Sequence, residues 1–412
     1  MRILFYLSFI LVFNFNSLGQ ICGTDEYNEP FIKNNPQKYI QIEENIQNYL
    51  TNTLPKSGHN IVIPVVFHIV WINNDQNLPD SVIHQQLKVL NNIFQLKNSD
   101  TILLTDTLKN WKGNFDIKFE LAYIDPDGLP TSGITRKRTI NPQFSYWNDP
   151  VKKPAYGIVP WPTTKYLNIW ICDLTEGLMG YSQFPGGPHF VDGVVIDWQT
   201  VGDQIYPWTY EINYKWAKGK ILVHEVGHWL NLFHPWGNGF FGCGEDYIPE
   251  ISSQPGPIYP GQACPDTMFS SCTDSGRLFI KHYMDYSGSD CQVCFTKNQV
   301  LRGLASLNTY RTEMVENYQP RLTIDNFSDI KINPTLTKGK VYIELPPFEG
   351  VVNIKVYDIK GRTIKNISTL QRFNELHLHN PPGVYLIDIY HNQNKIFNQK
   401  IIVSPASSYG GR

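Results

Sequence analysis

The pattern of hydrophobic and polar residues predicts alternating strands and helices over most of the chain. Residues 61–71 (IVIPVVFHIVW) are dominated by β-branched residues, which favours a buried strand. Apolar residues then recur at helical spacing between 79 and 94, and residues 218–230 (KGKILVHEVGHWL) form a second helical pattern. Strand patterns lie between the two helices, in the stretches FDIKFELAYI, YLNIWICDL and DGVVIDW. This order indicates an α/β (α+β) domain, with a helix on each side of a sheet as one arrangement.

After residue 323 the pattern changes to short strands joined by turns. The stretches VYIEL, VVNIKVYDI, GVYLIDIYH and KIIVS alternate in polarity and are separated by Asn, Gly and Pro residues. Such spacing is typical of a small all-β sandwich. The sequence therefore predicts a second domain over 323–412, whose strand pattern alone would also suit a carbohydrate-binding module.

The N-terminal residues are typical of a secretory signal peptide over 1–19. Arg2 precedes an apolar run over 3–13, and small residues follow at 17–19, where cleavage is expected. The run is too short to span a bilayer, so we expect export and not a membrane anchor. Residues 20–57 are polar, rich in Asn and Gln and poor in apolar periodicity, which indicates a propeptide or a flexible arm.

Charge and cysteine usage narrow the class of protein further. The formal net charge is −2, which argues against nucleic acid or an anionic membrane as the main partner. Export into an oxidising setting allows disulfides to persist. The chain has 7 cysteines, an odd number that leaves at least one thiol without an intramolecular partner. Five of them cluster in one loop-rich stretch: Cys243, Cys264, Cys272, Cys291 and Cys294.

The segment HEVGH, with His224 and His228 at its ends, carries the candidate chemistry. Two imidazoles four residues apart lie on one face of a helix, roughly 5–6 Å apart at Cβ, and can bind one cation. Catalytic zinc takes three protein ligands and keeps a position for water, so His234 is the expected third ligand. The chain must turn back near Asn231, a residue type that tolerates the left-handed conformation. Glu225 would then be the general base that activates the water and passes its proton to the leaving amine.

Other interpretations fit part of this pattern. A helix with chance histidines would not place a third His at a suitable offset behind an exported N-terminus. A structural zinc site usually has four protein ligands and no adjacent Glu. A non-catalytic secreted adhesin on a peptidase-like scaffold would need a broken zinc site, whereas a zinc hydrolase acting on something other than peptides would keep it. The intact set of histidines and Glu225 favours a secreted zinc-dependent endopeptidase that hydrolyses peptide bonds of proteins.

The zinc-motif helix and a later methionine-containing turn carry a family resemblance. HEVGHWLNLFH is similar to the long zinc motif of the metzincin clan, and HYMDY at 282–286 is similar to its Met-turn. The stretches IPVVFHIV, YLNIWICDL, GYSQFPGG, DGVVI, HYMDYSGSDC and CFTKNQVLRG occur in the order of the pappalysin family, over residues 60–305. The chain thus resembles a pappalysin. This resemblance implies a twisted five-stranded sheet, an active-site helix and a loop-rich lower subdomain.

The resemblance also assigns roles to individual residues. Met284 would form a hydrophobic floor beneath the metal, and Tyr286 would hydrogen-bond the oxyanion of the tetrahedral intermediate. Cys22, in the stretch Cys-Gly-Thr, is similar to the propeptide cysteine that blocks the zinc in relatives, so the zymogen would be latent through it. Two crossed disulfides are implied in the lower subdomain, joining Cys243 to Cys272 and Cys264 to Cys291. Cys172 and Cys294 are then left, with their pairing open.

Relatives also bind calcium between the zinc motif and the Met-turn, through carboxylate and carbonyl oxygens. The corresponding positions here are Asp246, Ile248 and Ile251, for which a solvated acidic loop is the alternative. Relatives that cleave before Arg have an acidic residue after the Met-turn. This chain has Ser289 and Asp290 there, so the cleavage preference stays open. We expect protein or peptide substrates, no nucleic-acid partner and a monomer.

The C-terminal region resembles the sorting domain of the type IX secretion system. The residues that carry this resemblance are Asn-Pro-Thr at 333–335, the run VNIKVYDIKGR and Pro-Gly-Val-Tyr at 382–385. It implies that the type IX machinery is a partner and that the protein is secreted or attached to the cell surface. The expected organisation is a signal peptide (1–19), a propeptide (20–57), a zinc metallopeptidase domain (58–322) and a C-terminal sorting sandwich (323–412).

Overall fold

The structure is a computed structural model of the 412-residue chain. It describes residues 22–405, with gaps at 54–60, 130, 176, 204–215, 238–241, 260–263, 266–267, 270–271, 273–276, 317–329, 347–350, 370, 379–380 and 392–393. The predicted signal peptide and the predicted boundary near 323 lie outside the described residues. Within the described part, no helix has the length and apolar character needed to cross a membrane.

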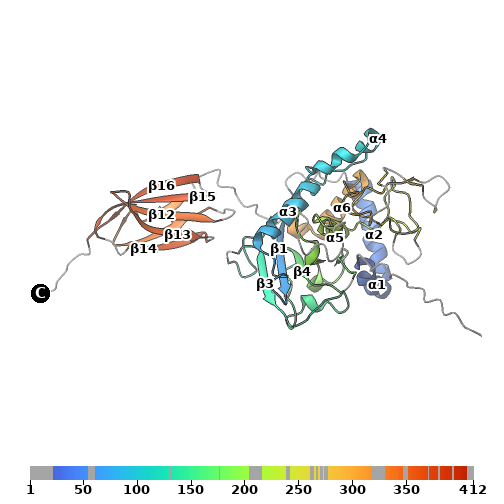
Figure 1. Cartoon of the computed structure of the whole chain (residues 1–412), viewed down its shortest axis with the longest axis horizontal. Coiled ribbons are helices and arrows are strands. Elements are labelled where there is room, and N and C mark those ends of the chain that lie inside the picture. The colour runs from blue at the N-terminus through green and yellow to red at the C-terminus, as the bar shows by residue number, and fades with distance from the viewer. Residues whose placement is uncertain are drawn as a thin grey trace, which may run out of the picture.

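Six strands form the main sheet of the larger domain (Figure 1). All of their pairs are parallel except the pair of β5 with β6. Their order is β2 (Ile117–Leu121), β1 (Ile61–Trp71), β4 (Leu167–Cys172), β6 (Val194–Asp197), β5 (Gly180–Ser182), with β3 (Ile134–Arg138) beside β1. The sheet thus has one strand more than the five that the resemblance implied. The first half of β1 pairs with β2 and its second half with β3, whose basic sequence ITRKR shows no apolar alternation.

The two faces of this sheet are covered differently. The helices α3 (Asp80–Phe94) and α5 (Lys220–Trp229) contact each other and share one core with the strands, so both lie on the same face. The expected arrangement with a helix on each side is therefore wrong. On the opposite face, Phe144 and Val151, from the segment between β3 and β4, pack over Trp170 and Tyr181. The loops between strands contribute enough apolar surface to replace a second helical layer.

The N-terminal segment forms two helices, α1 (Thr24–Asn34) and α2 (Pro36–Asn52), which Figure 1 shows against the body of the domain. Ile42 and Ile46 of α2, one turn apart, are buried against Ala305 of α6 (Lys297–Tyr310). The alternative of a flexible arm is therefore wrong. Most of the stability of a polar helix comes from its packing on a partner surface, and the partner lies far away in sequence. Sequence periodicity alone therefore gave little sign of these helices.

Loops connect the remaining short elements of this domain. After α3 come η1 (Ser99–Leu103) and α4 (Asp106–Lys109), and further along lie η2 (Pro150–Lys152), η3 (His189–Val191) and η4 (Trp198–Thr200). The segment after the zinc motif contains only the short strands β7 (Met268–Phe269) and β8 (Arg277–Leu278) among its described residues, and the domain closes with α6 and α7 (Thr312–Glu316). Thr296 and Gln299 form a capping box that starts α6. This part is the loop-rich lower subdomain that the sequence predicted.

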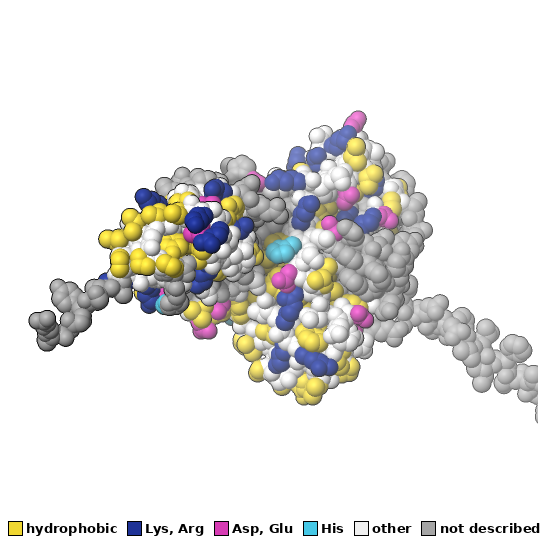
Figure 2. All heavy atoms as spheres, turned by 60° about the vertical axis from the view of Figure 1, so that its left-hand side comes forward, with side chains coloured by type: hydrophobic (Ala, Val, Ile, Leu, Met, Phe, Trp, Pro, Cys, Tyr) yellow, Lys and Arg dark blue, Asp and Glu magenta, His cyan; other side chains and the backbone are white. Residues whose placement is uncertain are grey.

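The C-terminal domain is a β-sandwich with its own core (Figure 1). Its larger sheet has the order β10 (Leu336–Thr337), β16 (Asn394–Val403), β15 (Gly383–His391), β12 (Val352–Asp358), β13 (Thr363–Thr369). Its smaller sheet has the order β14 (Phe373–His377), β11 (Lys340–Glu344), β9 (Lys331–Asn333). None of the residues of its core belongs to the core of the larger domain. In Figure 2, basic and acidic side chains are interspersed over both domains, as the net charge of −2 leads one to expect.

Candidate metal centre and active site

Three histidines meet at the C-terminal half of α5. His224 and His228 lie one turn apart on this helix, and His234 follows after the chain reverses. The three Nε2 atoms form a nearly equilateral triangle, with distances of 3.0 Å (His224 to His228), 3.1 Å (His228 to His234) and 3.2 Å (His224 to His234). All three residues are at most 4% exposed. The structure thus brings together the three ligands predicted from the sequence.

The other ring nitrogen of each histidine fixes its tautomer. Nδ1 of His224 donates to the carbonyl of Tyr283, and Nδ1 of His228 donates to the carbonyl of Leu232, both at 2.7 Å. Nδ1 of His234 lies 2.9 Å from the carboxylate of Asp25. Because carbonyl oxygens only accept, the protons sit on Nδ1 and the Nε2 lone pairs point at one another. Lone pairs converging in this way repel unless a cation lies between them, so these residues fit a metal ion.

Electrostatics favour neutral, ligating imidazoles here. Burial and the neighbouring His234 lower the pKa of His224 to about 3, and the same causes hold the pKa of His228 well below its usual range. The Sγ atom of Cys22 joins the group, because it and one ring nitrogen of each histidine all lie within 4.8 Å of one another. Burial and the charge of Glu225 raise the pKa of Cys22 well above its usual value. Cys22 is therefore a thiol unless a cation beside it stabilises the thiolate.

The predicted turn at Asn231 is present. Asn231 has φ 71°, in the left-handed region, and its N–H bonds to the carbonyl of His228 at 2.8 Å. Its own carbonyl accepts a hydrogen bond of 2.9 Å from Nε of Arg302, which is 1% exposed and belongs to α6. The guanidinium group also stacks on the ring of Phe233, at 4.9 Å from its centroid. Arg302 thus holds the reversal that brings His234 back to α5, although the sequence gave no sign of this.

Glu225 lies beside the histidines but is not one of the converging ligands. It is fully buried, and its Oε2 accepts a hydrogen bond of 2.9 Å from the hydroxyl of Thr24. Burial raises the pKa of Glu225 to about 8, although hydrogen bonds from Cys22 and Thr24 oppose this rise. A Cβ on Gly180 would come within 2.8 Å of its Cγ, so strand β5 passes directly over this carboxylate. Only a glycine allows that approach.

Met284 and Tyr286 of the Met-turn also lie beside the histidines. A Cβ on Gly227, between the two ligands on α5, would lie 2.5 Å from the sulfur of Met284. Met284 therefore packs directly under the helix, where the resemblance placed a hydrophobic floor. The ring of Tyr286 lies 5.7 Å from that of His224 and 5.2 Å from that of His234, centroid to centroid. Its hydroxyl donates a long hydrogen bond of 3.4 Å to the carbonyl of Cys22.

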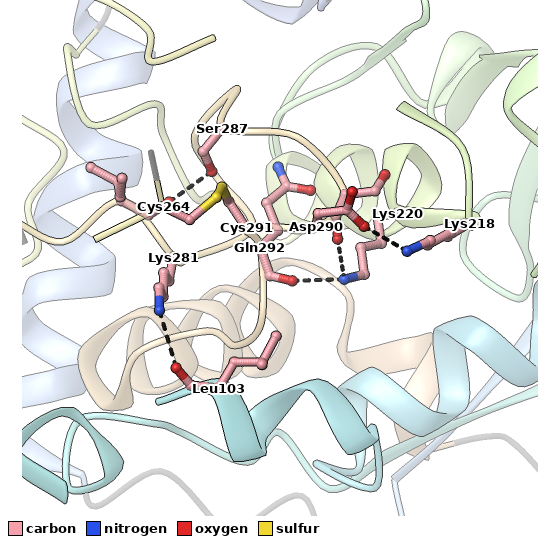
Figure 3. The surroundings of a disulfide bond; sticks show 11 residues. Leu103, Lys218, Lys220, Cys264, Lys281, Ser287, Asp290, Cys291 and Gln292 are labelled. Atoms are coloured by element: carbon pink, nitrogen blue, oxygen red, sulfur yellow. Dashed lines mark hydrogen bonds and ion pairs between the residues drawn. A yellow bond between two sulfur atoms is a disulfide. The ribbon is translucent and has the colours of Figure 1, made fainter. Parts of the chain in front are cut away.

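The loop after the Met-turn is held by a disulfide and by buried lysines (Figure 3). Disulfides join Cys264 to Cys291 and Cys243 to Cys272, the two pairs that the resemblance implied, and Cys172 and Cys294 are free and buried. Lys220, at the start of α5, donates to the carbonyls of Ser289 and Gln292 at 2.6 Å and 2.7 Å. Asp290 is mostly exposed and pairs with Lys218 at 2.6 Å. Asp290 therefore takes part in a solvent-exposed ion pair with a lysine.

The predicted calcium residues lie in the lower subdomain but do not converge in an evident site. Asp246 is buried, its Oδ1 accepts the N–H of Ile248 at 2.9 Å, and its Oδ2 has no hydrogen-bond partner among the described residues. Burial raises its pKa to about 7. The carbonyl of Ile248 already accepts the N–H of Ile251 at 3.0 Å. Calcium at Asp246, Ile248 and Ile251 stays a prediction.

The N-terminal segment lies over this site. The N–H of Gly23 bonds to the carbonyl of Gly180 at 2.9 Å, so the segment pairs with strand β5 beside the histidines. Glu43 of α2 makes a bidentate ion pair with Arg302, with distances of 2.6 Å and 2.8 Å. A cavity of about 810 Å³ remains between α1 and the lower subdomain. Sequence analysis assigned no role to Thr24, Asp25 and Glu43: the first two follow Cys22 closely, and Glu43 stands in a polar stretch with no motif around it.

Comparisons with known proteins identify relatives of this chain. Residues 156–308 match the family described as pregnancy-associated plasma protein-A, and residues 331–404 match the secretion system C-terminal sorting domain. A mutant of Tannerella forsythia promirolysin is 36% identical with a TM-score of 0.62, over 72% of this chain and 97% of that chain. Mature mirolysin from the same organism, solved with a cleaved peptide, is 39% identical with a TM-score of 0.56, over 62% and 95%. An extracellular metalloprotease of Colletotrichum graminicola is 27% identical over 266 residues, 61% of this chain and 78% of that protein.

The mixed α/β fold, the converging histidines and these relatives define a metalloendopeptidase. More specifically, the chain belongs to the pappalysin family of metallopeptidases and carries a type IX secretion sorting domain. The sorting domain and the extracellular relatives place the protein outside the cell or on its surface. The sequence-based predictions of family, enzyme class and location are thereby confirmed.

Proposed function

We propose that this protein is a secreted zinc-dependent endopeptidase made as a latent zymogen. His224, His228 and His234 would hold the metal, and Glu225 would act as general base. One observation carries the proposal: three Nε2 lone pairs converge within 3.2 Å of one another, next to a buried carboxylate that is not one of the ligands. Three imidazoles with one further position are the ligand set of catalytic zinc. A structural site would use a fourth protein ligand permanently.

Two residues of this chain would handle charge and protons during peptide hydrolysis. Zinc, when bound, would polarise a water molecule and the scissile carbonyl. The Oε2 atom of Glu225 already accepts a hydrogen bond from a hydroxyl group, and in the active enzyme it would accept a proton from the water and pass it to the leaving amine. The hydroxyl of Tyr286 donates to the carbonyl of Cys22, and with a substrate it would donate to the carbonyl oxygen that becomes negative.

Latency would come from the segment before β1, residues 20–57, acting as a propeptide. Cys22 brings its sulfur to the histidine group, where a thiolate would replace the catalytic water. Thr24 occupies the oxygen of Glu225 that the water would need. The polar contacts of Asp25 with His234 and of Glu43 with Arg302 then keep the segment in place. Removal of this segment would expose the site.

The remaining parts of the chain would serve export. We propose a signal peptide over 1–19, a peptidase domain over 58–322 and a sorting sandwich over 323–412 that engages the type IX secretion machinery. The separate hydrophobic core of the sandwich supports this division. The enzyme would act as a monomer on proteins or peptides.

The test of the catalytic assignment is Glu225→Ala, assayed after removal of the propeptide. We expect hydrolysis of a protein substrate to fall by roughly a hundred- to ten-thousandfold, the usual contribution of a positioned general base. Bound zinc, measured by metal analysis, should stay near one per chain, because Glu225 is not a ligand. Loss of zinc together with activity would contradict its role as base. Chelator-insensitive hydrolysis by the unsubstituted protein would contradict the zinc mechanism itself.

A further inference from the structure

A buried charged pair lies on the face of the sheet away from α5. Asp149 is 5% exposed and Lys152 is 3% exposed, and their side chains are 3.2 Å apart. The ring of Trp170 lies 5.2 Å from Nζ of Lys152, and the ring of Tyr181 lies 5.3 Å from it. The hydroxyl of Tyr181 donates to Oδ1 of Asp149 at 2.9 Å. These residues form a pocket whose walls are aromatic and whose base is ionic.

Tyr27 of the propeptide fills this pocket. Its ring lies 5.0 Å from that of Tyr181 and 4.7 Å from Nζ of Lys152. Its hydroxyl donates a short hydrogen bond to Oδ2 of Asp149 and accepts one of 3.0 Å from Lys152. Lys152 also donates to the carbonyl of Val191 at 2.8 Å. The hydroxyl of Tyr27 thus bonds to both charged groups at once: it donates to Asp149 and accepts from Lys152.

The pocket opens beside the strand along which a substrate would bind. β5 lies at the edge of the sheet, and the propeptide occupies its free hydrogen-bonding groups. The N–H of Ser182 bonds to the hydroxyl of Thr24 at 2.9 Å, and its carbonyl accepts the side-chain amide of Asn28 at 2.9 Å. When the propeptide leaves, these groups become available to an extended peptide.

The direction of the side chains connects that strand to the pocket. Gly180 faces Glu225 and α5, so Tyr181, the next residue, faces the opposite side of the sheet. A peptide residue paired beside Tyr181 would project its side chain on the same side as the tyrosine ring. That side chain would reach the position now held by Tyr27.

We propose that this pocket, vacated by Tyr27, is a substrate subsite that selects tyrosine. The inference rests on the proposed zymogen and endopeptidase function. Departure of Tyr27 removes one hydrogen-bond partner from Asp149 and one from Lys152, so a group that fills the pocket and restores both bonds is favoured there. A substrate tyrosine restores both bonds. A phenylalanine fills the same space but restores neither bond. An arginine is repelled by the charge of Lys152, and a glutamate is repelled by the charge of Asp149.

The experiment uses the secreted protein after removal of its propeptide and a set of peptides in which Tyr, Phe, Arg, Glu or Ala is placed at each position around one scissile bond. At one position we expect kcat/KM for Tyr to exceed that for Phe by roughly tenfold, since a site built around a hydroxyl discriminates against its absence. O-methyltyrosine, which cannot donate to Asp149, should be cleaved no better than Phe. This first part of the experiment needs no protein variant, so a folding defect cannot affect its result.

The variant Asp149→Asn provides the second part of the experiment. The ratio of Tyr to Phe cleavage should fall toward one, whereas Asp127→Asn, at an exposed position, should leave the ratio unchanged. If peptides are cleaved but Tyr gains nothing over Phe at any position, the pocket serves only the propeptide and the inference is wrong, while the endopeptidase function stands. If no peptide and no protein substrate is cleaved, the proposed function fails and the inference fails with it.

Discussion

Asp25 of the N-terminal segment, the proposed propeptide, accepts a hydrogen bond from His234, with 2.9 Å between Oδ2 and Nδ1. The carboxylate holds the proton of His234 on Nδ1 and leaves Nε2 free to face the other two histidines. Partners of this kind orient metal ligands and raise their basicity. The segment that covers the site therefore also orders His234, one of its proposed metal ligands.

Asp25→Ala should weaken the hold of the latent protein on its metal. We expect a chelator to remove zinc roughly tenfold faster, since loss of such a hydrogen-bond partner costs about 10- to 100-fold in metal affinity. The measurement is zinc release to a colorimetric chelator, in the Glu225→Ala background so that self-cleavage does not interfere. Glu29→Ala is the matched control, because Glu29 lies on the same helix and pairs with Lys33 in a largely exposed contact. Equal release from both variants would show that Asp25 does not support the metal.

Cys22→Ala should shorten or abolish latency. The thiol is the propeptide atom that reaches the histidine group, so its loss leaves the position of the water open. We expect full-length protein that processes itself soon after secretion, detected by time-resolved electrophoresis and by cleavage of a quenched peptide. Cys172→Ala removes another buried free thiol, on β4, and should leave latency as it is. A Cys22→Ala protein that stays inactive would mean that Thr24 and the ion pairs block the site without Cys22.

Tyr286→Phe should reduce kcat and leave KM and zinc content nearly unchanged. The hydroxyl would act on charge that develops only in the transition state, and removal of one such donor costs roughly 100- to 1,000-fold. Tyr166→Phe, whose hydroxyl bonds to the carbonyl of Ile124 far from the histidines, is the control. A Tyr286→Phe enzyme with an unchanged kcat would exclude the oxyanion role.

Lowering the pH should weaken the binding of the propeptide to the peptidase, because Glu43 becomes protonated. Burial by itself would raise the pKa of Glu43, but the hydrogen bonds and charge of Arg302 outweigh burial and lower it. A lowered pKa means that docking favours the carboxylate. The contribution of this ion pair is therefore complete above the usual Glu pKa of about 4.3 and is lost as the pH falls through the lowered value.

The measurement is the affinity of a separate 20–57 peptide for the Glu225→Ala peptidase as a function of pH. At neutral pH, Glu43→Gln should weaken binding at least about tenfold, because it leaves a buried guanidinium without its anion. The loss of affinity between roughly pH 5 and pH 3 should be smaller for Glu43→Gln than for the unsubstituted peptide. Parallel pH curves for the two peptides would rule out a role for this pair.

A chain that ends at Leu322 should fold and cleave proteins like the longer form. The sandwich core and the peptidase core share no residue, so their separation exposes no large apolar surface. In the source organism the shortened protein should accumulate in the cell envelope instead of outside, as seen by fractionation and immunoblotting. Insoluble shortened protein would show that the domains depend on each other, and its normal secretion would contradict the sorting role.

The parts of the site that the sequence could predict are residues that lie close together in the chain at a characteristic spacing. His224 and His228 are one helical turn apart, and Asn231 was identified as the turn because few other residues accept φ near 71°. Met284 packs on Gly227 of α5, and only the family resemblance, not local spacing, suggested a hydrophobic floor at Met284.

The parts that could not be predicted depend on pairs distant in sequence. Glu43 and Arg302 are separated by 259 residues, and Asp25 and His234 by 209. Strand β3 was missed for a related reason, because its pairing with β1 outweighs a sequence that is largely basic. Such residues show no periodicity in the sequence, and their structural role depends on the partner that the fold places beside them.

The described contacts between the propeptide and the peptidase are hydrogen bonds, ion pairs and apolar packing, and they extend from Cys22 in front of α1 to α2. A cut between α2 and β1 therefore severs the chain without breaking any of them. If residues 20–57 act as the proposed propeptide, the cleaved protein would start as a complex of enzyme and fragment, and its activity would appear only as the fragment dissociates or is degraded. The onset of activity would then depend on dilution: a concentrated pool would stay inactive after processing, whereas the same molecules would become active as they spread into a larger volume.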